Sequence, residues 1–461
     1  MKVITIDRKN FLKGFSMTKW TNDGGFSPES KGFEVSRGST RGLLHNGRQL
    51  NETSTNLADN VVALTKYVSG QTFGYFALGD AGKIYFTDPS PTISHTVKGT
   101  ESNKTYDSNS DIIVYNNKLF FTSTNDIGQA DLDFNTIDED WWTTAKSKTA
   151  LTAGVPHKLF IFNGVLYITN GNKIALHDGD ADTQNDAKLT LPTGWIITDV
   201  EVFSNKIFIT ASYGTNDLTK STPTMIFVWD GYSENWIKEL PINEAAISFI
   251  QVLGGNIYFL AGKTLFLTDG FTYKPVYNFE ALGIGSGVNF HTKAVYDGVL
   301  YFWGGAGSNG IYAYDTRTGA VSCPVYSEST ITAITIGFLD YIDLYAETNK
   351  YYQCDVNSAG QVLYSNWYNF ERPYRIVKVE ITFGDALTSG ATYQVELYNE
   401  KEKIHTKTVS YANDSGIIHK TYKLNALSNS FKLKLTSTNS NNKSIKILKV
   451  YAEPSEQHQD N

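Results

Sequence analysis

Short apolar runs alternate along the chain with tight turns that carry asparagine or glycine. Within Lys158–Asp178, an apolar run leads into Asn163-Gly164, a second run follows, and the chain turns again at Asn170-Gly171. Asn-Gly tolerates the positive φ angles that a two-residue hairpin turn requires. The pattern therefore predicts three short antiparallel strands in this segment.

The same template recurs along most of the chain. The first turn of each copy falls at Asn117, Gly164, Asn205, Gly255, Gly298 and, in a degenerate copy, near Tyr341. The intervals are 47, 41, 50, 43 and 43 residues, and a strand pair within Gly74–Asp88 precedes the series. A repeat of about 40–45 residues with about four strands is typical of a β-propeller blade. We expect about seven blades within residues 56–370, or six if an outlying copy is not a full blade.

Aromatic side chains at the strand positions of these copies suit the interfaces between blades. Each blade has to bury two faces against its neighbours, so the ring has to close. We assign this packing role to Phe162, Tyr167, Phe208, Tyr258 and Tyr301. A sugar-stacking platform is the alternative role for them.

The segments on either side of the repeats differ in character. Residues 1–55 mix glycine, serine and isolated aromatics, so they form either an extended arm, anchored by Trp20, Phe26 and Phe33, or the outer strand that closes the propeller. Residues 371–454 hold six or more alternating strands, which predicts a β-sandwich after a boundary at Glu371–Pro373. Residues 455–461 are a polar tail. The predicted fold class is all-β.

Composition adds an uneven charge to this picture. The chain has 461 residues, of which 41% are hydrophobic and 19% charged, so it can bury a core. Residues 371–451 hold 13 Lys and Arg against 7 Asp and Glu, whereas residues 1–370 hold 27 against 37. An acidic body thus carries a basic C-terminal module. The basic charge either solvates and protects strand edges or faces an acidic partner.

The remaining sequence features concern location. The N-terminus lacks the apolar core of a secretory signal, and no run approaches 18 apolar residues. We therefore expect no membrane association and synthesis in a reducing cytosol. Cys323 and Cys354 are expected to be thiols, and a disulfide between adjacent blades is the alternative.

No concentrated catalytic motif stands out. The chain has no G-x-S-x-G elbow, P-loop or H-E-x-x-H, and its eight histidines are scattered without metal-ligand spacing. Gly283–Gly287 is rich in glycine but lacks the strand–helix frame of a phosphate-binding loop, so we expect a connection between blades. The sequence predicts a protein that is not an enzyme, with no catalytic residue, cofactor or metal ligand.

Two groups of carboxylates are candidates for a metal site or a catalytic site despite that prediction. Asp178, Asp180 and Asp182 alternate as at the start of a calcium loop, but Thr183 and Leu189 occupy the positions that need Gly and Glu. A solvated acidic loop is therefore expected.

A glycosidase-type propeller would need carboxylates that point into the central channel. Asp199, Asp297 and Asp340 are candidates whose direction the sequence does not determine.

The layout as a whole resembles a known group of proteins. The blade repeats follow an irregular segment with the lead-in Gly24–Ser30, and Phe370–Pro373 opens the C-terminal strands. This combination resembles the propeller-bearing structural proteins of tailed-bacteriophage virions, in particular the packaged-DNA stabilisation or tail-nozzle group. The resemblance implies a non-enzymatic structural component of the tail or neck, made in the host cytoplasm and located in the virion. It also implies a homo-oligomeric ring, contacts with portal, adaptor or tail subunits, and a wall that DNA passes without being gripped.

Two other classes of function stay open. Aromatics near turns, Trp141-Trp142 and Trp236, suggest a surface-recognition propeller that binds glycans, or a polysaccharide-processing enzyme. The blander alternative is a protein-interaction scaffold, a role that propellers commonly have.

Overall fold

The computed structural model describes most of the chain. The described residues are 2–6, 33–35, 44–46, 49–52, 57–69, 72–88, 94–100, 104–177, 184–215, 222–308, 310–317, 319–326, 330–336, 342–346, 350–355, 361–364, 368–383, 386–387, 389–399, 403–437 and 445–455. Nearly all the regular structure is β, so the all-β prediction is confirmed.

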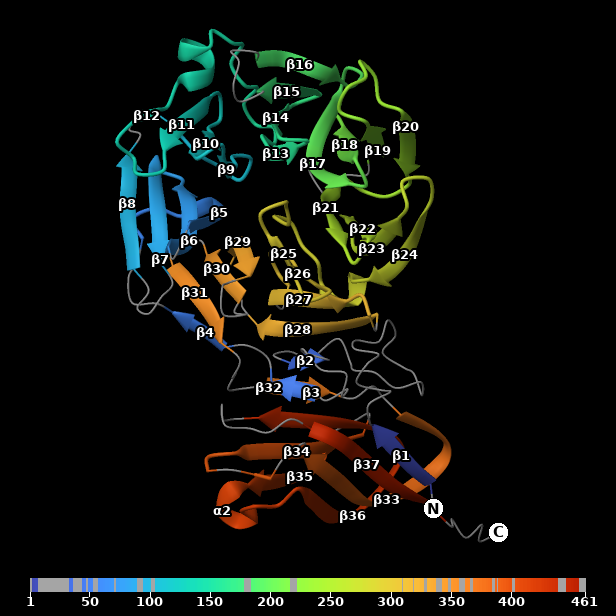
Figure 1. Cartoon of the computed structure of the whole chain (residues 1–461). Helices are drawn as coiled ribbons and strands as arrows, with labels where there is room; N and C mark the ends of the chain where they lie inside the picture. Colours follow the sequence, from blue (N-terminus) through green and yellow to red (C-terminus); the bar gives the residue numbers. More distant parts are fainter. Residues whose placement is uncertain are drawn as a thin grey trace.

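Seven four-stranded antiparallel blades form a ring, which confirms the predicted propeller (Figure 1). Blades 1 to 3 comprise β5–β8 (Val61–Ser69, Thr72–Gly79, Lys83–Asp88, Ser94–Thr100), β9–β12 (Ile112–Tyr115, Lys118–Thr122, Ile127–Asp131, Ile137–Asp138) and β13–β16 (Leu159–Phe162, Val165–Asn170, Lys173–His177, Gln184–Thr190). Blades 4 to 6 comprise β17–β20 (Trp195–Phe203, Lys206–Tyr213, Thr224–Trp229, Lys238–Ile242), β21–β24 (Ile247–Leu253, Asn256–Ala261, Thr264–Thr268, Tyr273–Asn278) and β25–β28 (Lys293–Tyr296, Val299–Trp303, Gly310–Asp315, Ala320–Tyr326). Two helical turns, η1 (Trp141–Ala145) and η2 (Glu280–Leu282), lie in the connections that follow blades 2 and 5.

Blade 7 joins the two ends of the propeller sequence. It contains β29 (Ile331–Ile336), β30 (Ile342–Ala346) and β31 (Lys350–Asp355), and its outermost strand is β4 (Gln49–Glu52) from the N-terminal segment. The backbone pairs run from Tyr352 with Glu52 to Asp355 with Gln49. Part of the N-terminal segment therefore closes the ring, one of the two roles that the sequence allowed.

The hairpin turns explain why the repeats form blades. In five successive blades the two residues of the first turn both have positive φ, for example 51° and 77° at Asn163 and Gly164. Such turns match the right-handed twist of the strands that they connect. The predicted turns at Asn117, Gly164, Asn205, Gly255 and Gly298 are confirmed, whereas Tyr341 lies outside the described residues.

Apolar clusters fill the interfaces between neighbouring blades. Each of the seven interfaces contains its own cluster of buried side chains, such as the one that joins Phe162 and Tyr167 of blade 3 to Trp229 of blade 4. The five aromatics expected to pack between blades are all buried. Their inter-blade role is confirmed, and burial removes them from any sugar platform.

The C-terminal strands form one hydrogen-bonded sheet. They are β32 (Gln361–Tyr364), β33 (Tyr368–Phe383), β34 (Thr392–Tyr398), β35 (Lys403–Ser410), β36 (His419–Ser437) and β37 (Ile445–Pro454), with the short helix α2 (Tyr411–Asp414) before β36. The first half of β36 pairs mainly with β33 and its second half with β34, so the strand carries the sheet across a fold. Two separate sheets of a β-sandwich are therefore not confirmed. The strands β32 and β33 also start before Glu371.

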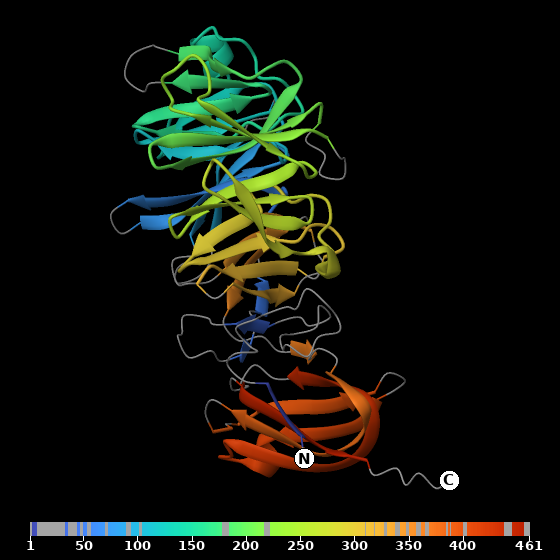
Figure 2. The ribbon, with the colours of Figure 1, turned by 90° about the vertical axis from the view of Figure 1, so that its right-hand side faces the viewer.

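The N-terminal segment connects the propeller and the C-terminal sheet. β1 (Lys2–Ile6) pairs with β37, while β2 (Phe33–Val35) pairs with β28 of blade 6 and with β3 (Leu44–Asn46). β3 also pairs with β37, so a single hydrogen-bonded sheet runs from blade 6 to the C-terminal strands. Figures 1 and 2 show β2 and β3 between the two parts of the molecule. The side chains of Trp20, Phe26 and Phe33 lie outside the described residues.

Candidate functional site

The propeller brings side chains from distant parts of the sequence to its central channel. The first strands of the blades, β5, β9, β13, β17, β21, β25 and β29, lie innermost in the ring (Figure 1). Most neighbouring first strands also contact one another directly. Side chains at the start of these strands can therefore meet across the axis.

One position of the repeat carries charge in three of the seven blades. Equivalence is set by pairing with the second strand of the same blade, and the residues are Ala63, Asp111, Lys158, Asp199, Phe249, Thr292 and Ala333 in blades 1 to 7. In blade 6 the next residue, Lys293, carries the charge. We call Asp111, Lys158, Asp199 and Lys293 the channel charges. Their signs alternate around the ring, which favours mutual pairing over repulsion.

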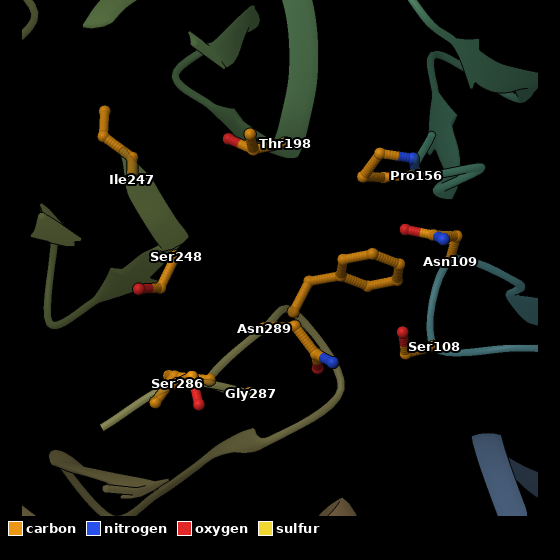
Figure 3. Close-up of a pocket in the computed structure, with 11 residues that line it drawn as sticks. Ser108, Asn109, Pro156, Thr198, Ile247, Ser248, Ser286, Gly287 and Asn289 are labelled. Atoms are coloured by element: carbon orange, nitrogen blue, oxygen red, sulfur yellow. The ribbon is translucent and has the colours of Figure 1, made fainter. Parts of the chain in front are cut away.

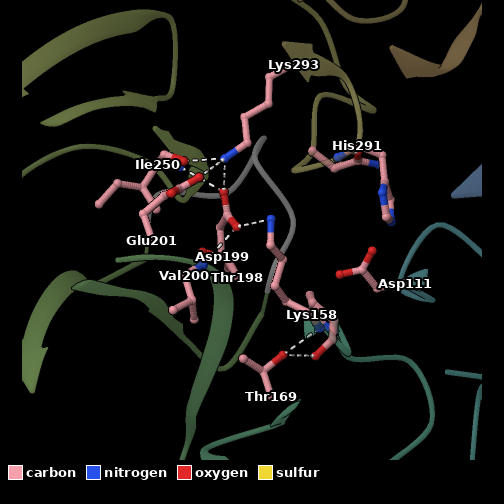
Figure 4. Close-up of polar contacts among 12 residues, drawn as sticks. Asp111, Lys158, Thr169, Thr198, Asp199, Val200, Glu201, Ile250, His291 and Lys293 are labelled. Atoms are coloured by element: carbon pink, nitrogen blue, oxygen red, sulfur yellow. Dashed lines mark hydrogen bonds and ion pairs between the residues drawn. The ribbon is translucent and has the colours of Figure 1, made fainter. Parts of the chain in front are cut away.

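Asp199 is the hub of the channel charges (Figure 4). Its carboxylate is fully buried and lies 3.2 Å from the Lys158 ammonium and 2.7 Å from the Lys293 ammonium. It also accepts the backbone N–H groups of Val200 and Ile250, at 2.8 and 3.0 Å. Lys293 in turn contacts Glu201 at 3.4 Å and donates to the Ile250 carbonyl. The cluster links blades 3, 4, 5 and 6.

Asp111 makes a related connection between blades 2 and 3. Its two carboxylate oxygens accept the N–H groups of Ile112 and Leu159, both at 2.8 Å. A carboxylate that accepts an N–H from its own blade and one from the next blade is thus used twice in the ring, by Asp111 and Asp199. This repeated arrangement satisfies backbone donors that would otherwise be buried without partners.

A third contact crosses the channel between blades that are not neighbours. The Nε2–H group of His291, at the start of blade 6, donates to the Ser110 carbonyl of blade 2 at 2.6 Å. This hydrogen bond and the ion pairs of Asp199 with Lys158 and Lys293 connect blades across the channel. The channel is therefore bridged by protein groups at the level of the channel charges.

Burial and pairing move the pKa values of these groups in different directions. Burial raises the pKa of the Asp111 carboxyl to about 6, because the Lys158 ammonium and two N–H groups only partly oppose it. Burial also raises the pKa of Asp199, but Lys158 and Lys293 outweigh it and hold that pKa below its usual range. The Glu201 pKa is raised by burial. Burial and the nearby Lys158 charge lower the His291 pKa to about 3, so the imidazole is neutral.

Two cavities flank the bridged level of the channel. One, which we call the upper cavity, has a volume of about 190 Å³ and is lined by Ser108, Asn109, Pro156, Thr198, Ile247, Ser248, Ser286, Gly287, Val288, Asn289 and Phe290 (Figure 3). The other, which we call the lower cavity, has a volume of about 230 Å³ and is lined by Leu64, Thr65, Lys66, Asp111, Lys158, Phe290, His291, Lys293, Ile334 and Thr335. The buried Phe290 lines both, so its ring lies between them. The upper cavity carries hydroxyls and amides, whereas the lower one carries charge.

Two of the carboxylates considered from the sequence lie in the described part of the chain, in different places. Asp199 lies in the channel, but both of its oxygens are held in ion pairs. Asp297 lies in the first turn of blade 6, where it is 54% exposed and 3.5 Å from the Arg317 guanidinium. Asp340 and the acidic segment Asp178–Asp182 lie outside the described residues. Asp199 and Asp297, the two candidates within the described residues, are not brought together as a glycosidase pair would be.

The expectation that these tryptophans are exposed is wrong for Trp141 and Trp142, while glycan binding itself stays an alternative. Trp141 and Trp142 are 6% and 1% exposed, because the turn η1 directs both into the interface between blades 2 and 3. The Trp142 indole donates to the Thr149 carbonyl at 3.0 Å, and Trp141 packs against His177. Trp236 is partly buried on Phe227 and donates to Glu239 at 2.6 Å.

The glycine-rich segment and the cysteines are two further features of the sequence. The glycine-rich segment connects blades 5 and 6, as expected, and Gly285 lies so close to Ala306 that a Cβ would be 1.8 Å from its carbonyl oxygen. Cys323 is buried, and its thiol lies 3.5 Å from the Val325 carbonyl. The Cys354 side chain lies outside the described residues.

The channel charges were missed in the sequence, although the repeat contains a signal for them. Asp111, Lys158 and Asp199 each precede the first-turn residue of their blade, Asn117, Gly164 and Asn205, by six positions. Aligned copies therefore show charge at a strand position next to apolar residues. In a closed ring, that placement predicts a cluster on the axis.

Other kinds of site were sought in the described part of the chain. It contains no group of three or more His, Cys, Asp or Glu side chains placed to hold a metal ion. None of its helices is both long enough and apolar enough to span a membrane.

Comparisons with known proteins give likeness of fold at low similarity. No family model and no curated protein matches the chain. The WD40 β-propeller domain of Doa1 is 13% identical with a TM-score of 0.45, over 67% of this chain and 97% of that one. A computationally designed protein, Ika8, is 12% identical with a TM-score of 0.43, over 67% and 99%. An exo-β-1,3-galactanase from Phanerochaete chrysosporium is 11% identical with a TM-score of 0.33, over 87% and 100%. Scores this low identify no relative, and the propeller assignment rests on the seven blades themselves.

Proposed function

We propose that this protein is a non-enzymatic structural component of a phage virion, in the tail or neck region. In this role the propeller is a rigid block, and neighbouring subunits are contacted through the N-terminal segment and the C-terminal sheet. The proposal combines the resemblance in sequence layout with the internal bracing of the channel. It also uses the uneven charge of the chain, which gives the two parts opposite signs.

The observation that carries the proposal is the bridged channel. A catalytic or cofactor site needs polar groups that are left available for a ligand. Here Asp199, Lys293 and His291 form ion pairs and hydrogen bonds that connect blades 2, 3, 4, 5 and 6. These contacts serve the ring itself, which is what a building block requires.

The bridged channel also limits how DNA would be accommodated. In the proposed role, a duplex passes along an outer wall of an assembled ring, because side chains cross the axis of each propeller. The net acidic charge of residues 1–370 repels phosphate from such a wall. DNA would slide past without sequence-independent binding.

The test locates the protein in virions. Purified particles from a host that carries this gene are labelled with an antibody to the full chain and imaged by electron microscopy. We expect label at the tail or neck, and rings when the purified protein is imaged alone or with its neighbours. Particles that lack the protein altogether, established by mass spectrometry of the same preparation, would overturn the proposal.

A glycan-binding surface is the second candidate, and one observation favours it. Tyr232 and Phe271 are 62% and 63% exposed, and they occupy equivalent Asp-Gly-aromatic turns of blades 4 and 5. In both turns the aspartate accepts two backbone N–H groups. The Tyr232 hydroxyl accepts from the Asn163 amide at 2.6 Å, and the Lys238 ammonium lies 3.6 Å from the centre of the Phe271 ring, so both rings are held in place. Exposed aromatic rings can stack on sugars.

A glycan array separates the two candidates. Saturable binding that the double substitution Tyr232→Ala and Phe271→Ala abolishes would favour surface recognition. The matched control is Ile237→Ala, which removes an apolar side chain that is 50% exposed from the same connection in blade 4.

A further inference from the structure

The upper cavity has a buried floor and an exposed rim. Thr198 and Ser248, on the first strands of blades 4 and 5, belong to the buried part of its lining, and the Phe290 ring separates it from the lower cavity. Ser108 and Ser286 are exposed, so the cavity opens to solvent on their side. Figure 3 shows these residues around one shared space. A small solute can therefore enter the cavity from outside.

The lining of this cavity is polar but neutral. Among the described residues that form it, none has a charged side chain, and its polar side chains are hydroxyls and amides. Phe290 and Pro156 add apolar surface. The volume of about 190 Å³ corresponds to about six water molecules, well below the pocket of a drug-sized ligand. The lining therefore suits one small uncharged molecule that carries both hydroxyl and C–H groups.

Several of these polar groups retain capacity for hydrogen bonds. The Asn109 amide donates to Asp107 at 3.2 Å, which leaves its Oδ1 atom as an acceptor. The Oδ1 atom of Asn289 accepts the His291 N–H group at 2.9 Å, which leaves its amide nitrogen as a donor. The Ser248 hydroxyl is buried and has no hydrogen-bond partner among the described residues. Buried polar groups are normally satisfied, so this hydroxyl indicates a missing partner.

We propose that the upper cavity binds one neutral sugar unit. A sugar ring carries hydroxyls around its edge, which both donate and accept, and C–H groups on its faces. Asn289 donates to these hydroxyls and Asn109 accepts from them, while the Phe290 ring packs against a C–H face. Ser248 turns its hydroxyl towards the sugar by a change of rotamer.

This site is separate from the exposed rings of Tyr232 and Phe271. Pro156, which lines the cavity, precedes β13, whereas Asn163 follows it. The Tyr232 hydroxyl contacts the Asn163 amide, so its turn lies at the other end of the first strands. The proposal therefore rests on neither of the functions proposed above, and its failure would leave both unchanged.

Saturation-transfer difference NMR on the full chain tests the proposal, with glucose, galactose and N-acetylglucosamine as separate probes and glycerol as the comparison. We expect saturable binding of at least one sugar in the millimolar range, and weaker binding of glycerol, because glycerol has hydroxyls but no ring face. The double variant Tyr232→Ala and Phe271→Ala should bind the sugar as the parent chain does. Absence of saturable binding of all three sugars, equal binding of glycerol, or loss of binding in the double variant would overturn the proposal.

Matched serine variants assign the site to the cavity. Ser248→Ala removes the unpartnered hydroxyl and should weaken binding about three- to tenfold without lowering thermal stability. Ser212→Ala removes another buried hydroxyl without a partner among the described residues, on β18 and outside the cavity lining, and should bind as the parent chain does. Ser286→Trp, at the exposed rim, should block entry and abolish binding. Equal affinity of Ser248→Ala and Ser212→Ala, or undiminished binding by Ser286→Trp, would place the sugar elsewhere and contradict the proposal.

Discussion

The first strands of the propeller and strand β33 of the C-terminal sheet are both antiparallel, yet they place their charged side chains differently. In the C-terminal sheet, alternate residues of β33 point inward and outward, so Val379 and Ile381 are buried while Lys378 and Glu380 form an ion pair near the surface. In the propeller, the first strands converge on an axis, and Asp199 is buried there with Lys293. The difference comes from ring closure rather than from composition.

This contrast shows what an ion pair can do in each setting. A surface pair is solvated and screened, so it adds little to stability. A buried pair has lost its hydration, so it adds little overall, but removing one partner leaves a charge without compensation. The channel charges therefore fix how the blades are arranged, whereas the Lys378–Glu380 pair on β33 lies near the surface and adds little.

The largest expected effect is at the hub of the channel. Replacing Asp199 with Ala leaves Lys158 and Lys293 buried without their shared carboxylate, which should lower the free energy of unfolding by about 3–5 kcal/mol. Urea-induced unfolding followed by tryptophan fluorescence measures the change. The control is Asp297→Ala at the exposed turn, with an expected loss below about 1 kcal/mol. Equal losses in the two variants would remove the distinction between buried and exposed pairs.

A second test compares backbone packing in the two regions. Gly285→Ala in the connection of blades 5 and 6 places a methyl group against the Ala306 backbone, which should cost about 2–3 kcal/mol through overpacking. Gly416 lies before β36 with φ of 73° and open space around it, so Gly416→Ala should cost only about 1 kcal/mol of strain. Thermal unfolding of both variants checks the order, and the reverse order would contradict it.

The contributions of Asp111 in the propeller and Glu380 in the C-terminal sheet to the free energy of unfolding should change with pH in opposite directions. In the folded chain the Asp111 pKa is about 6, above its ordinary value of 3.8, so the folded state binds more protons between these values. Stability due to Asp111 is therefore present at pH 4 and lost as the pH rises to 6, by about 2–3 kcal/mol. Glu380 behaves oppositely, because the Tyr451 hydroxyl and Lys378 lower its pKa, and its contribution is lost as the pH falls.

Paired measurements isolate these contributions. The difference in unfolding free energy between the parent chain and Asp111→Asn, followed from pH 4 to 6.5, should decline as the pH rises. A flat difference would show that Asp111 titrates normally and that the channel does not bury it.

The smallest effect is expected on the C-terminal sheet. Glu380→Gln weakens the contacts with Lys378 and Tyr451 but leaves no buried charge, so the loss should be about 0.5 kcal/mol. Chemical unfolding in low and high salt measures it, and salt should reduce the parent chain's advantage. A loss of unfolding free energy comparable to that of Asp199→Ala would mean that the surface pair matters as much as the buried channel charges.

The sequence predicted the local structure of this protein better than its long-range contacts. Turns such as Asn163-Gly164 are encoded by adjacent residues, so the blades followed from periodicity, which left their number at seven or six. Strand β36 has 19 residues and bends, so it belongs to two parts of one sheet. The alternation of apolar and polar residues alone does not distinguish this arrangement from the two sheets of a sandwich. The channel site combines residues up to 182 positions apart, from Asp111 to Lys293, so it required the ring geometry before its members could be recognised.

The tryptophans show the opposite limitation. Trp141-Trp142 was expected to be exposed because it lies near a turn. The turn η1 instead folds both rings into an interface whose other half, Leu159 and Ile168, belongs to the next blade. Burial of such residues is decided by a neighbour that the local sequence does not reveal.

Closure of blade 7 by β4 also sets the order of events during protein synthesis. The ribosome makes Gln49–Glu52 before the first blade and reaches Lys350, where their partner strand begins, about 300 residues later. At about 5–20 residues per second, the early strand has to wait about 15–60 s for its partner. A nascent chain that is released before that point leaves the ring open, with one unpaired strand and bare sheet faces exposed to aggregation.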